Sequence, residues 1–395
     1  MNQVSILPAA QRWPVGCEPS SGSARHVIRH IFCAAITSLA ALLSLSLVPA
    51  AGAVPRYSAR YEQNCTLCHV NPTGGGLRGL YASQYLVPEE MTVKTPADYA
   101  LQQIDPQIGT NLVVGADLRT LHLYSSVEDE HGSNFFQMQG DLYFSFQLDR
   151  IGAYLDTGLS GRYEVFGTAH VLPAQGYIKV GRFLPAYGWK FADHTMFVRE
   201  QLGFFPPSHT DIGAEAGLYP GRFALHAAVL NGNPGATIDD NSELAAVGRA
   251  AYRFNWLGTS LAVGGSAYRN PRASGRRLAS GLFGYVALWR LTWLWEADGT
   301  RVYPVGQSRR DGFVTSHELA VAVVRGFDVL ATYDFHDPDI DRKTGARSRW
   351  GGGVSLFAHP LFRAGFLVRY LAIDEGANVE GEDHVETVLE LHFLY

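Results

Sequence analysis

Charged residues are scarce in this chain of 395 residues, where Asp, Glu, Lys and Arg together make up 17%, against roughly a quarter of an ordinary soluble domain. Long apolar runs are scarce as well, and after residue 48 no stretch is long enough and apolar enough for a transmembrane helix. An excess of positive charge is also missing, because the formal net charge is −5. The composition therefore disfavours a typical soluble domain, a helical membrane protein and a protein that binds nucleic acid.

One apolar run near the start of the chain is the exception, and it extends over residues 31–48. A basic stretch precedes it, and small residues in an A-x-A pattern follow it and end at Ala53. This order predicts a secretory signal peptide over residues 1–53, cleaved before Val54. An uncleaved transmembrane anchor is the alternative, since the run is long enough to span a bilayer. The helix breaker Pro49 and the small residues after it favour cleavage and export.

Cysteine is rare too: the chain has four, and only Cys65 and Cys68 lie outside the predicted signal peptide. Together with His69 they form a C-x-x-C-H motif, the pattern of c-type haem attachment. Two thiols add to the two vinyl groups of one porphyrin, while the adjacent imidazole reaches the iron from the same face. The motif therefore predicts one covalent haem c, bound by the Cys65 and Cys68 thioethers, with His69 as the proximal axial ligand of the iron.

Three other roles for this cysteine pair are less well supported. A disulfide or thioredoxin-like redox pair normally opens a helix inside a βαβ unit, and the sequence pattern contains no such unit. Zinc would need two further ligands, and the next histidine, His122, already lies in a predicted strand. Exposed free thiols without a role are unusual in an exported protein.

The sequence does not identify the distal ligand of the haem iron. Met91 is the one methionine between the motif and the predicted barrel, and a methionine opposite a histidine raises the reduction potential and suits electron transfer. Packing inside a small helical core is the alternative role for Met91. By strand phase His226 and His392 point into the predicted lumen, and an empty sixth position is a further alternative.

Residues 54–108 are expected to form a compact haem segment. Two helical stretches are predicted there, one over residues 77–87 that stops at Pro88 and one over residues 95–104. The three glycines that follow the motif, residues 74–76, are interpreted as a hinge. A segment of this size cannot cover a porphyrin alone, so we expect it to lie in or under the lumen of the barrel.

From about Asn111 onward apolar and polar residues alternate, as in the stretch FQMQGDLYFSFQLDR. A period of two indicates strands with one apolar face and one wet face. Short turns and longer polar links alternate between these stretches, which is typical of an outer-membrane β-barrel. A β-sandwich is the alternative, but the faces opposite the apolar ones are too polar for the second side of a sandwich. The pattern predicts an all-β fold, a transmembrane antiparallel β-barrel over residues 109–395.

Counting strands back from the last residue, Tyr395, gives sixteen, with fourteen as the alternative. The count of sixteen requires two short strands within residues 151–170. The aromatic end TVLELHFLY resembles the closing strand of bacterial outer-membrane proteins, which would place the short turns in the periplasm and the long loops outside. The link over residues 184–209 is long and aromatic, and we expect it to fold into the lumen as a constriction. A lid over the mouth is the alternative.

This layout resembles the fused outer-membrane monohaem cytochrome–porins of iron-oxidising bacteria. The resemblance covers the architecture of the whole mature chain, and in sequence it is specific at Cys65, Cys68 and His69. The barrel is also loosely similar to phosphate-selective porins, over residues 176–200 and 213–232. The resemblance implies a protein of the bacterial outer membrane that combines a haem with a porin-like barrel.

Electron transfer across the outer membrane is the leading functional hypothesis, because a haem carries one electron and a barrel removes the lipid barrier. The expected partners are outer-membrane lipid and, for redox exchange, periplasmic or extracellular cytochromes or metal ions such as iron. One alternative is a diffusion porin whose haem is structural or acts as a gate. A second is a haem enzyme or a sensor of small ligands. The sequence favours a carrier without enzymatic activity.

Overall fold

The computed structural model describes residues 55–61, 63–93, 105–127, 130–159, 163–204, 209–342, 345–374 and 383–395. The predicted signal peptide, residues 1–53, and the second predicted helix, residues 95–104, lie outside the described residues. Within those ranges, no helix has both the length and the apolar character needed to cross a membrane.

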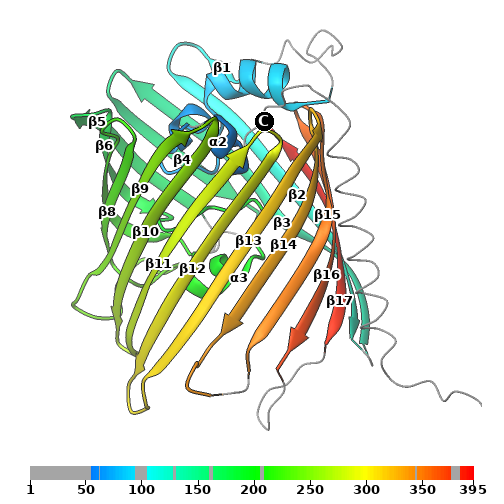
Figure 1. Cartoon of the computed structure of the whole chain (residues 1–395). Helices are drawn as coiled ribbons and strands as arrows, with labels where there is room; N and C mark the ends of the chain where they lie inside the picture. Colours follow the sequence, from blue (N-terminus) through cyan, green and yellow to red (C-terminus); the bar gives the residue numbers. More distant parts are fainter. Residues whose placement is uncertain are drawn as a thin grey trace, which may run out of the picture. The chain divides into compact units, whose positions relative to one another are not determined.

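Strands make up most of the described chain, and they wrap into a barrel (Figure 1). They are β1 (Gln107–Ile108), β2 (Leu112–Val127), β3 (Glu130–Leu148), β4 (Ile151–Gly158), β5 (Tyr163–Leu172), β6 (Gly176–Phe183), β7 (Asp211–Leu218), β8 (Phe223–Leu230), β9 (Ala245–Trp256), β10 (Thr259–Arg272), β11 (Gly275–Leu288), β12 (Leu291–Pro304), β13 (Arg310–Val324), β14 (Phe327–Asp337), β15 (Arg347–His359), β16 (Phe362–Ile373) and β17 (His384–Leu394).

Each strand from β2 to β17 pairs antiparallel with its neighbours in the sequence, and β17 returns to pair with β2. The sheet therefore closes as a barrel of sixteen strands, with the short β1 added beside β2. The predicted strand number is confirmed. The two short strands that the count required are β4 and β5, joined through residues 159–162.

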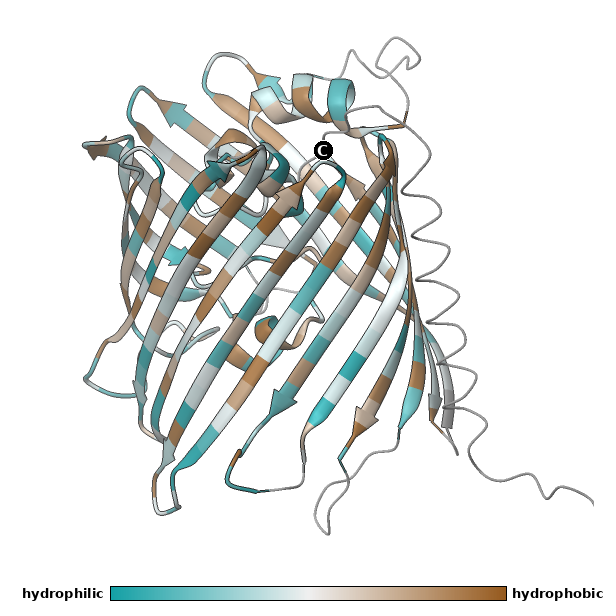
Figure 2. Cartoon of the chain, viewed as in Figure 1, coloured by the Kyte–Doolittle hydropathy of each residue, from teal (hydrophilic) through white to brown (hydrophobic). Residues whose placement is uncertain are grey.

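The barrel wall alternates between an outer apolar face and an inner polar face. On β3 the outward side chains of Leu142 and Phe146 are 55% and 47% exposed, whereas the inward Asp141 and Ser145 are 3% and 5% exposed. Figure 2 shows the corresponding brown and teal bands along the strands. This pattern confirms the predicted barrel and excludes a sandwich, because the inner face carries charge.

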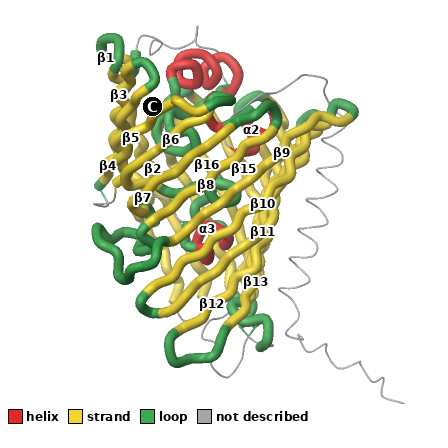
Figure 3. The backbone as a smooth tube through the Cα atoms, turned by 90° about the vertical axis from the view of Figure 1, so that its left-hand side faces the viewer, coloured by secondary structure: helices red, strands yellow, loops and turns green. Residues whose placement is uncertain are grey.

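Two parts of the chain enter the barrel, and the wide helix η2 (Ala82–Met91) of the first part lies across the barrel end (Figure 1). The first, which we call the N-terminal segment, is residues 55–93 with 62 undescribed, and it contains α2 (Pro55–Tyr61), the short 3₁₀ turn η1 (Cys65–Leu67) and η2. The second, the lumenal loop, is residues 184–204 and contains α3 (Phe197–Leu202). Helix α2 packs against β10, β11 and β12, and α3 packs against β12, β13 and β14. Figure 3 shows both helices within the ring of strands.

The first helix after the motif differs from its prediction, because η2 continues past Pro88 to Met91. Proline removes one backbone donor from a helix, and here the helix adopts wide π-type turns instead of ending. The hydroxyl of Thr92 donates to the carbonyl of Pro88 at 3.2 Å, just after the helix.

The N-terminal segment sits at the end of the barrel that carries the short turns. The amide of Val93 donates to the carbonyl of Phe357 at 3.0 Å, and Arg78 donates to the carbonyl of Pro360 at 3.1 Å. The turn residue Arg325 donates to the carbonyl of Glu89 at 2.9 Å. These contacts tie the segment to two neighbouring turns.

The hydrophobic core of the protein lies in the lumen, and the lumenal loop supplies much of it. The rings of Tyr187 and Phe204 stack at 4.6 Å, and the indole of Trp189 meets Phe283 of the wall edge-on at 5.2 Å. The predicted inward folding of this loop is therefore confirmed. A barrel of this size encloses more space than its own side chains can fill, and the loop occupies part of it.

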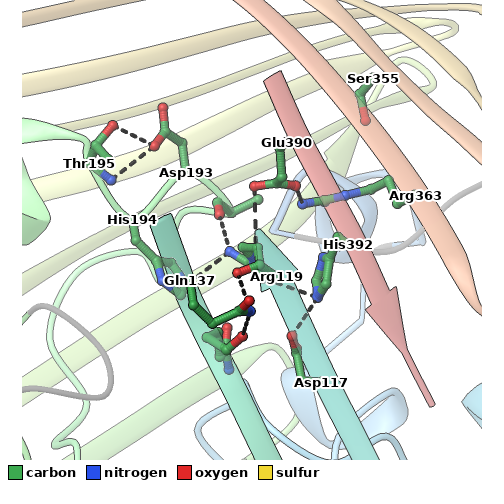
Figure 4. A network of polar contacts seen from close by, with 12 residues as sticks. Asp117, Arg119, Gln137, Asp193, His194, Thr195, Ser355, Arg363, Glu390 and His392 are labelled. Atoms are coloured by element: carbon green, nitrogen blue, oxygen red, sulfur yellow. Dashed lines mark hydrogen bonds and ion pairs between the residues drawn. The ribbon is translucent and has the colours of Figure 1, made fainter. Parts of the chain in front are cut away.

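Charged side chains of the wall hold the lumenal loop in place. Arg119 donates to the carbonyl of Ala192 at 3.1 Å and contacts His194 and His392 (Figure 4). Arg369 of β16 pairs with Asp193 at 2.8 Å. The loop carries complementary groups at the points where wall charges would otherwise lie buried alone.

The ion pair between Lys179 of β6 and Glu215 of β7 is fully buried, with 2.7 Å between Nζ and Oε1. Glu215 also accepts hydrogen bonds from the hydroxyl of Tyr177 at 2.8 Å and from the amide of Ala186 at 3.2 Å. A buried charge is tolerated when it is paired and hydrogen-bonded. Removal of one member of such a pair strongly lowers the stability of the fold.

We predict that Glu215→Gln lowers the free energy of unfolding by about 3–5 kcal/mol, because it leaves the Lys179 ammonium buried without a counter-charge. The measurement is urea unfolding of the folded barrel in detergent micelles. Glu243→Gln is the matched control, since it breaks an exposed ion pair with Arg269 and should change little. Equal losses from the two substitutions would contradict this assignment.

Candidate functional site

The C-x-x-C-H motif forms one tight turn of backbone. The amides of Cys68 and His69 both donate to the carbonyl of Cys65, at 3.1 and 2.9 Å. Residues three and four positions apart on such a turn lie on the same side. The turn thus brings Cys65, Cys68 and His69 together, as the motif predicts.

These three residues line a cavity of about 260 Å³ inside the barrel. Its other walls are the lumenal loop, which contributes Tyr187, Trp189 and Lys190, and inward side chains of several strands. Both cysteines are free and half-buried. The thiols are therefore accessible from this partly open cavity.

The segment Asn71–Gly76, which follows the motif directly, is held by the wall and the lumenal loop. Asn71 donates to the carboxylate of Glu164 at 3.3 Å, and the hydroxyl of Tyr219 donates to the carbonyl of Pro72 at 2.8 Å. Lys190 donates to the carbonyl of Gly74 at 2.7 Å. We call this segment the docking loop.

The three glycines of the docking loop are required by its geometry. Their φ angles are 80°, 82° and 63°, in the region that disfavours side chains. A Cβ on Gly74 would lie 3.1 Å from the sulfur of Cys65, and one on Gly76 would lie 2.1 Å from the hydroxyl of Tyr154. The glycines therefore permit close packing of the motif against the wall, in contrast to the hinge that the sequence suggested.

The charge states of the motif residues follow from burial. Burial, helped by the charges of Arg78 and Lys190, lowers the pKa of His69 to about 4. Its imidazole is neutral at neutral pH, which is the form that binds a metal ion. Burial also raises the pKa of the Cys68 thiol to about 11, with a smaller contribution from Cys65.

Met91, the predicted distal ligand, is buried in an apolar cluster with Tyr57, Leu86, Val87 and Phe357. Leu67 and Cys68 pack against this cluster. The structure thus places Met91 near the motif, but Met91 is not among the residues that line the cavity.

Both histidines that the strand phase directs inward line the cavity, as does His194 of the lumenal loop. Nε2 of His392 lies 2.7 Å from a carboxylate oxygen of Asp117, and Nε2 of His226 lies 3.3 Å from the hydroxyl of Tyr219. The predicted inward orientation of His226 and His392 is confirmed. His194 lies in the long link between strands, where no periodicity predicts its direction.

The residues of this turn fit a covalently attached haem. Two free thiols and a neutral imidazole share one side of a turn that lines the cavity. The zinc alternative needs further ligands, and across the described ranges no group of three or more His, Cys, Asp or Glu side chains is placed to hold a metal ion. Cys65 and Cys68 would hold the porphyrin, and His69 would bind its iron.

Several residues of the site were not found from sequence. Lys190, Tyr219 and Arg249 all line the cavity, yet they lie more than a hundred residues from the motif in the chain. The alternation along β9 predicts that Arg249 points into the lumen. It does not predict which segment of the chain lies beside Arg249 there.

We predict that Gly76→Ala destabilises the protein more than Gly75→Ala. Both positions have positive φ, so each alanine costs about 1 kcal/mol of backbone strain. Only at Gly76 does the added methyl collide with Tyr154, because the nearest atom to a Cβ on Gly75 is 3.9 Å away. The collision should add about 1–3 kcal/mol, measured by unfolding in urea; equal losses would show that the docking loop is not tightly packed.

Comparison with known proteins identifies the fold and no closer relationship. No protein-family model matches the chain, and no curated protein matches it. OmpT of Vibrio cholerae, an outer-membrane protein, is similar in structure with a TM-score of 0.54 and 9% identity, over 74% of this chain and 100% of that one. An anion-selective porin from Comamonas acidovorans has a TM-score of 0.52 and 9% identity, over 72% of this chain and 99% of that one. The chain thus has the fold of an outer-membrane porin, a β-barrel that implies a lipid environment.

Proposed function

We propose that this protein is an electron carrier of the bacterial outer membrane, in which a porin-type barrel holds one covalent haem c inside its lumen. The observation that carries the proposal is the position of Cys65, Cys68 and His69, on one turn that faces a partly open cavity inside the barrel. A diffusion pore has no need of such a turn. A haem at this point would exchange one electron at a time with a partner.

The position of the motif indicates where that exchange takes place. The N-terminal segment contacts the short turns, and short turns face the periplasm in bacterial outer-membrane barrels. The apolar band of such a barrel is about 25 Å tall, so a single haem near one end does not span it. The haem therefore exchanges electrons with a periplasmic cytochrome directly, and with an extracellular cytochrome or metal ion through a further step.

The chain's own residues would control the environment of the iron. Tyr187 and Trp189 bring aromatic surface to the cavity. The docking loop holds the motif beside Tyr154 of β4, Glu164 of β5 and the turn residue Tyr219, which follows β7. Fixed geometry and partial exclusion of water limit reorganisation around a redox centre. These features suit electron transfer at a constant position.

A diffusion porin with a structural or gating haem is the second candidate, and one observation favours it. The arginines that line the cavity outnumber the acidic residues there, five against three, and cationic side chains in a pore favour the passage of anions. Under this candidate the barrel conducts ions whether or not haem is attached.

We predict that the purified outer-membrane protein shows a c-type reduced-minus-oxidised spectrum, that Cys65→Ala/Cys68→Ala loses it, and that reconstituted barrels conduct little current in planar bilayers. The reason is that the thioethers are the attachment and the lumenal segments obstruct the pore. Thr66→Ala is the matched control, since Thr66 is exposed within the same turn and should leave the haem in place.

Each contrary result identifies a different error. No c-type absorbance in the wild-type protein would refute the haem. A haem-bearing barrel with porin-like conductance, kept in the cysteine variant, would favour the diffusion porin. A five-coordinate iron that binds carbon monoxide would favour an enzyme or a ligand sensor.

A further inference from the structure

The inward face of β9 beside the motif reads Arg249, Ala251, Arg253, because every second residue of a strand points the same way. Ala251 pairs with Ala224 of β8, and Ala262 lies on the neighbouring β10. All five residues line the cavity. The small side chains of the alanines leave space beside the wall. The two arginines place one positive charge at each end of this space.

Arg249 and Arg253 line the cavity without an ion pair in the described part of the chain, as do Arg78 and Lys190, whereas several other charged residues of the cavity are paired. Arg363 pairs with Glu390, and His392 pairs with Asp117. Neither Arg249 nor Arg253 forms an ion pair with any carboxylate of the described ranges. Both side chains are half-buried, and a guanidinium without a counter-charge beside a cavity can bind a carboxylate through paired hydrogen bonds, so this wall is suited to an anionic ligand.

Each guanidinium is held in position with donors to spare. Nε of Arg249 donates to the carbonyl of Gly188 at 3.0 Å, and its guanidinium lies 4.4 Å from the ring centre of Phe283. Arg253 donates to the carbonyl of Gln63, two residues before Cys65. An arginine has five N–H donors, so both side chains retain donors for a ligand.

His226 of the adjacent strand adds an independent observation. Its side chain is 8% exposed and lines the same cavity, and its Nδ1 is buried without a hydrogen-bond partner in the described part of the chain. A buried polar atom without a partner indicates a missing ligand or water. The wall formed by β8 and β9 is therefore incomplete in its polar contacts.

We propose that Arg249 and Arg253 bind two carboxylates of one ligand, and that these are the propionate groups of the haem attached at Cys65 and Cys68. This inference rests on the proposed function. The planar guanidinium matches a carboxylate through paired hydrogen bonds. The thioethers then fix the vinyl side of the porphyrin, and the β9 arginines fix its propionate side.

The test is the reduction potential of the haem-loaded, full-length protein, by spectroelectrochemistry. Arg249→Gln/Arg253→Gln should keep its covalent haem, because the thioethers remain, but the propionate charges lose their partners and the oxidised iron is favoured. We expect the equilibrium constant for reduction to fall about tenfold, equivalent to about 59 mV for a one-electron couple. Arg249→Lys/Arg253→Lys keeps the charges and should restore most of the potential, and Arg269→Gln, at an exposed ion pair, should have no effect.

Two results would overturn the inference while leaving the proposed function intact. One is a wild-type potential in the glutamine double variant with haem attached. The other is binding of free succinate to the haem-loaded wild type that is lost in that variant, since the arginines would then be available to a separate anion. Absence of covalent haem from the wild type would instead refute the proposed function itself.

Discussion

Burial of charge inside a sixteen-stranded barrel is the constraint on which the rest of this structure depends. Strand alternation directs charged side chains into the lumen, and the lumen is too wide for the wall alone to pair them. Segments of the same chain enter the lumen and supply the missing hydrogen-bond partners. Glu296 of β12 accepts a hydrogen bond from the amide of Trp189 at 2.6 Å, and Asp334 of β14 accepts one from the amide of Phe197 at 3.1 Å. Asp328 likewise pairs with Arg60 of the N-terminal segment at 2.9 Å. The positions of both lumenal segments follow from these pairings.

Much of this fold is predictable because its signals are local. Alternation along β3 identifies the faces of that strand, and tight turns separate it from its neighbours, so the count of sixteen needs no knowledge of tertiary contacts. The aromatic content of the lumenal loop indicates that it is not an ordinary exposed link. The course of η2 through Pro88 was not predictable, because the contacts of Val93 and Glu89 with distant turns outweigh the local preference of proline.

The candidate site was also predictable only where its signal is local in the sequence. The spacing of Cys65, Cys68 and His69 is set by the chemistry of haem attachment, so the motif can be recognised from five consecutive residues of the sequence. The role of the docking loop is not visible, because Thr73 meets Lys179 and Lys190 at 3.4 and 3.3 Å only when strands far along the chain have closed around it. The neighbours of the two β9 arginines were not predictable either. Strand alternation indicates that Arg249 and Arg253 point inward, but it does not indicate which segment lies opposite them.

The proposed function depends on one haem bound covalently to this chain, and intact mass spectrometry of the protein purified from outer membranes can detect it. We expect a mature chain that starts at Val54 and carries the added mass of one haem, and we expect this added mass to be absent from the variant that lacks both cysteines. A wild-type mass equal to that of the unmodified polypeptide would refute the covalent haem, and the protein would then be a porin-type barrel with an occupied lumen.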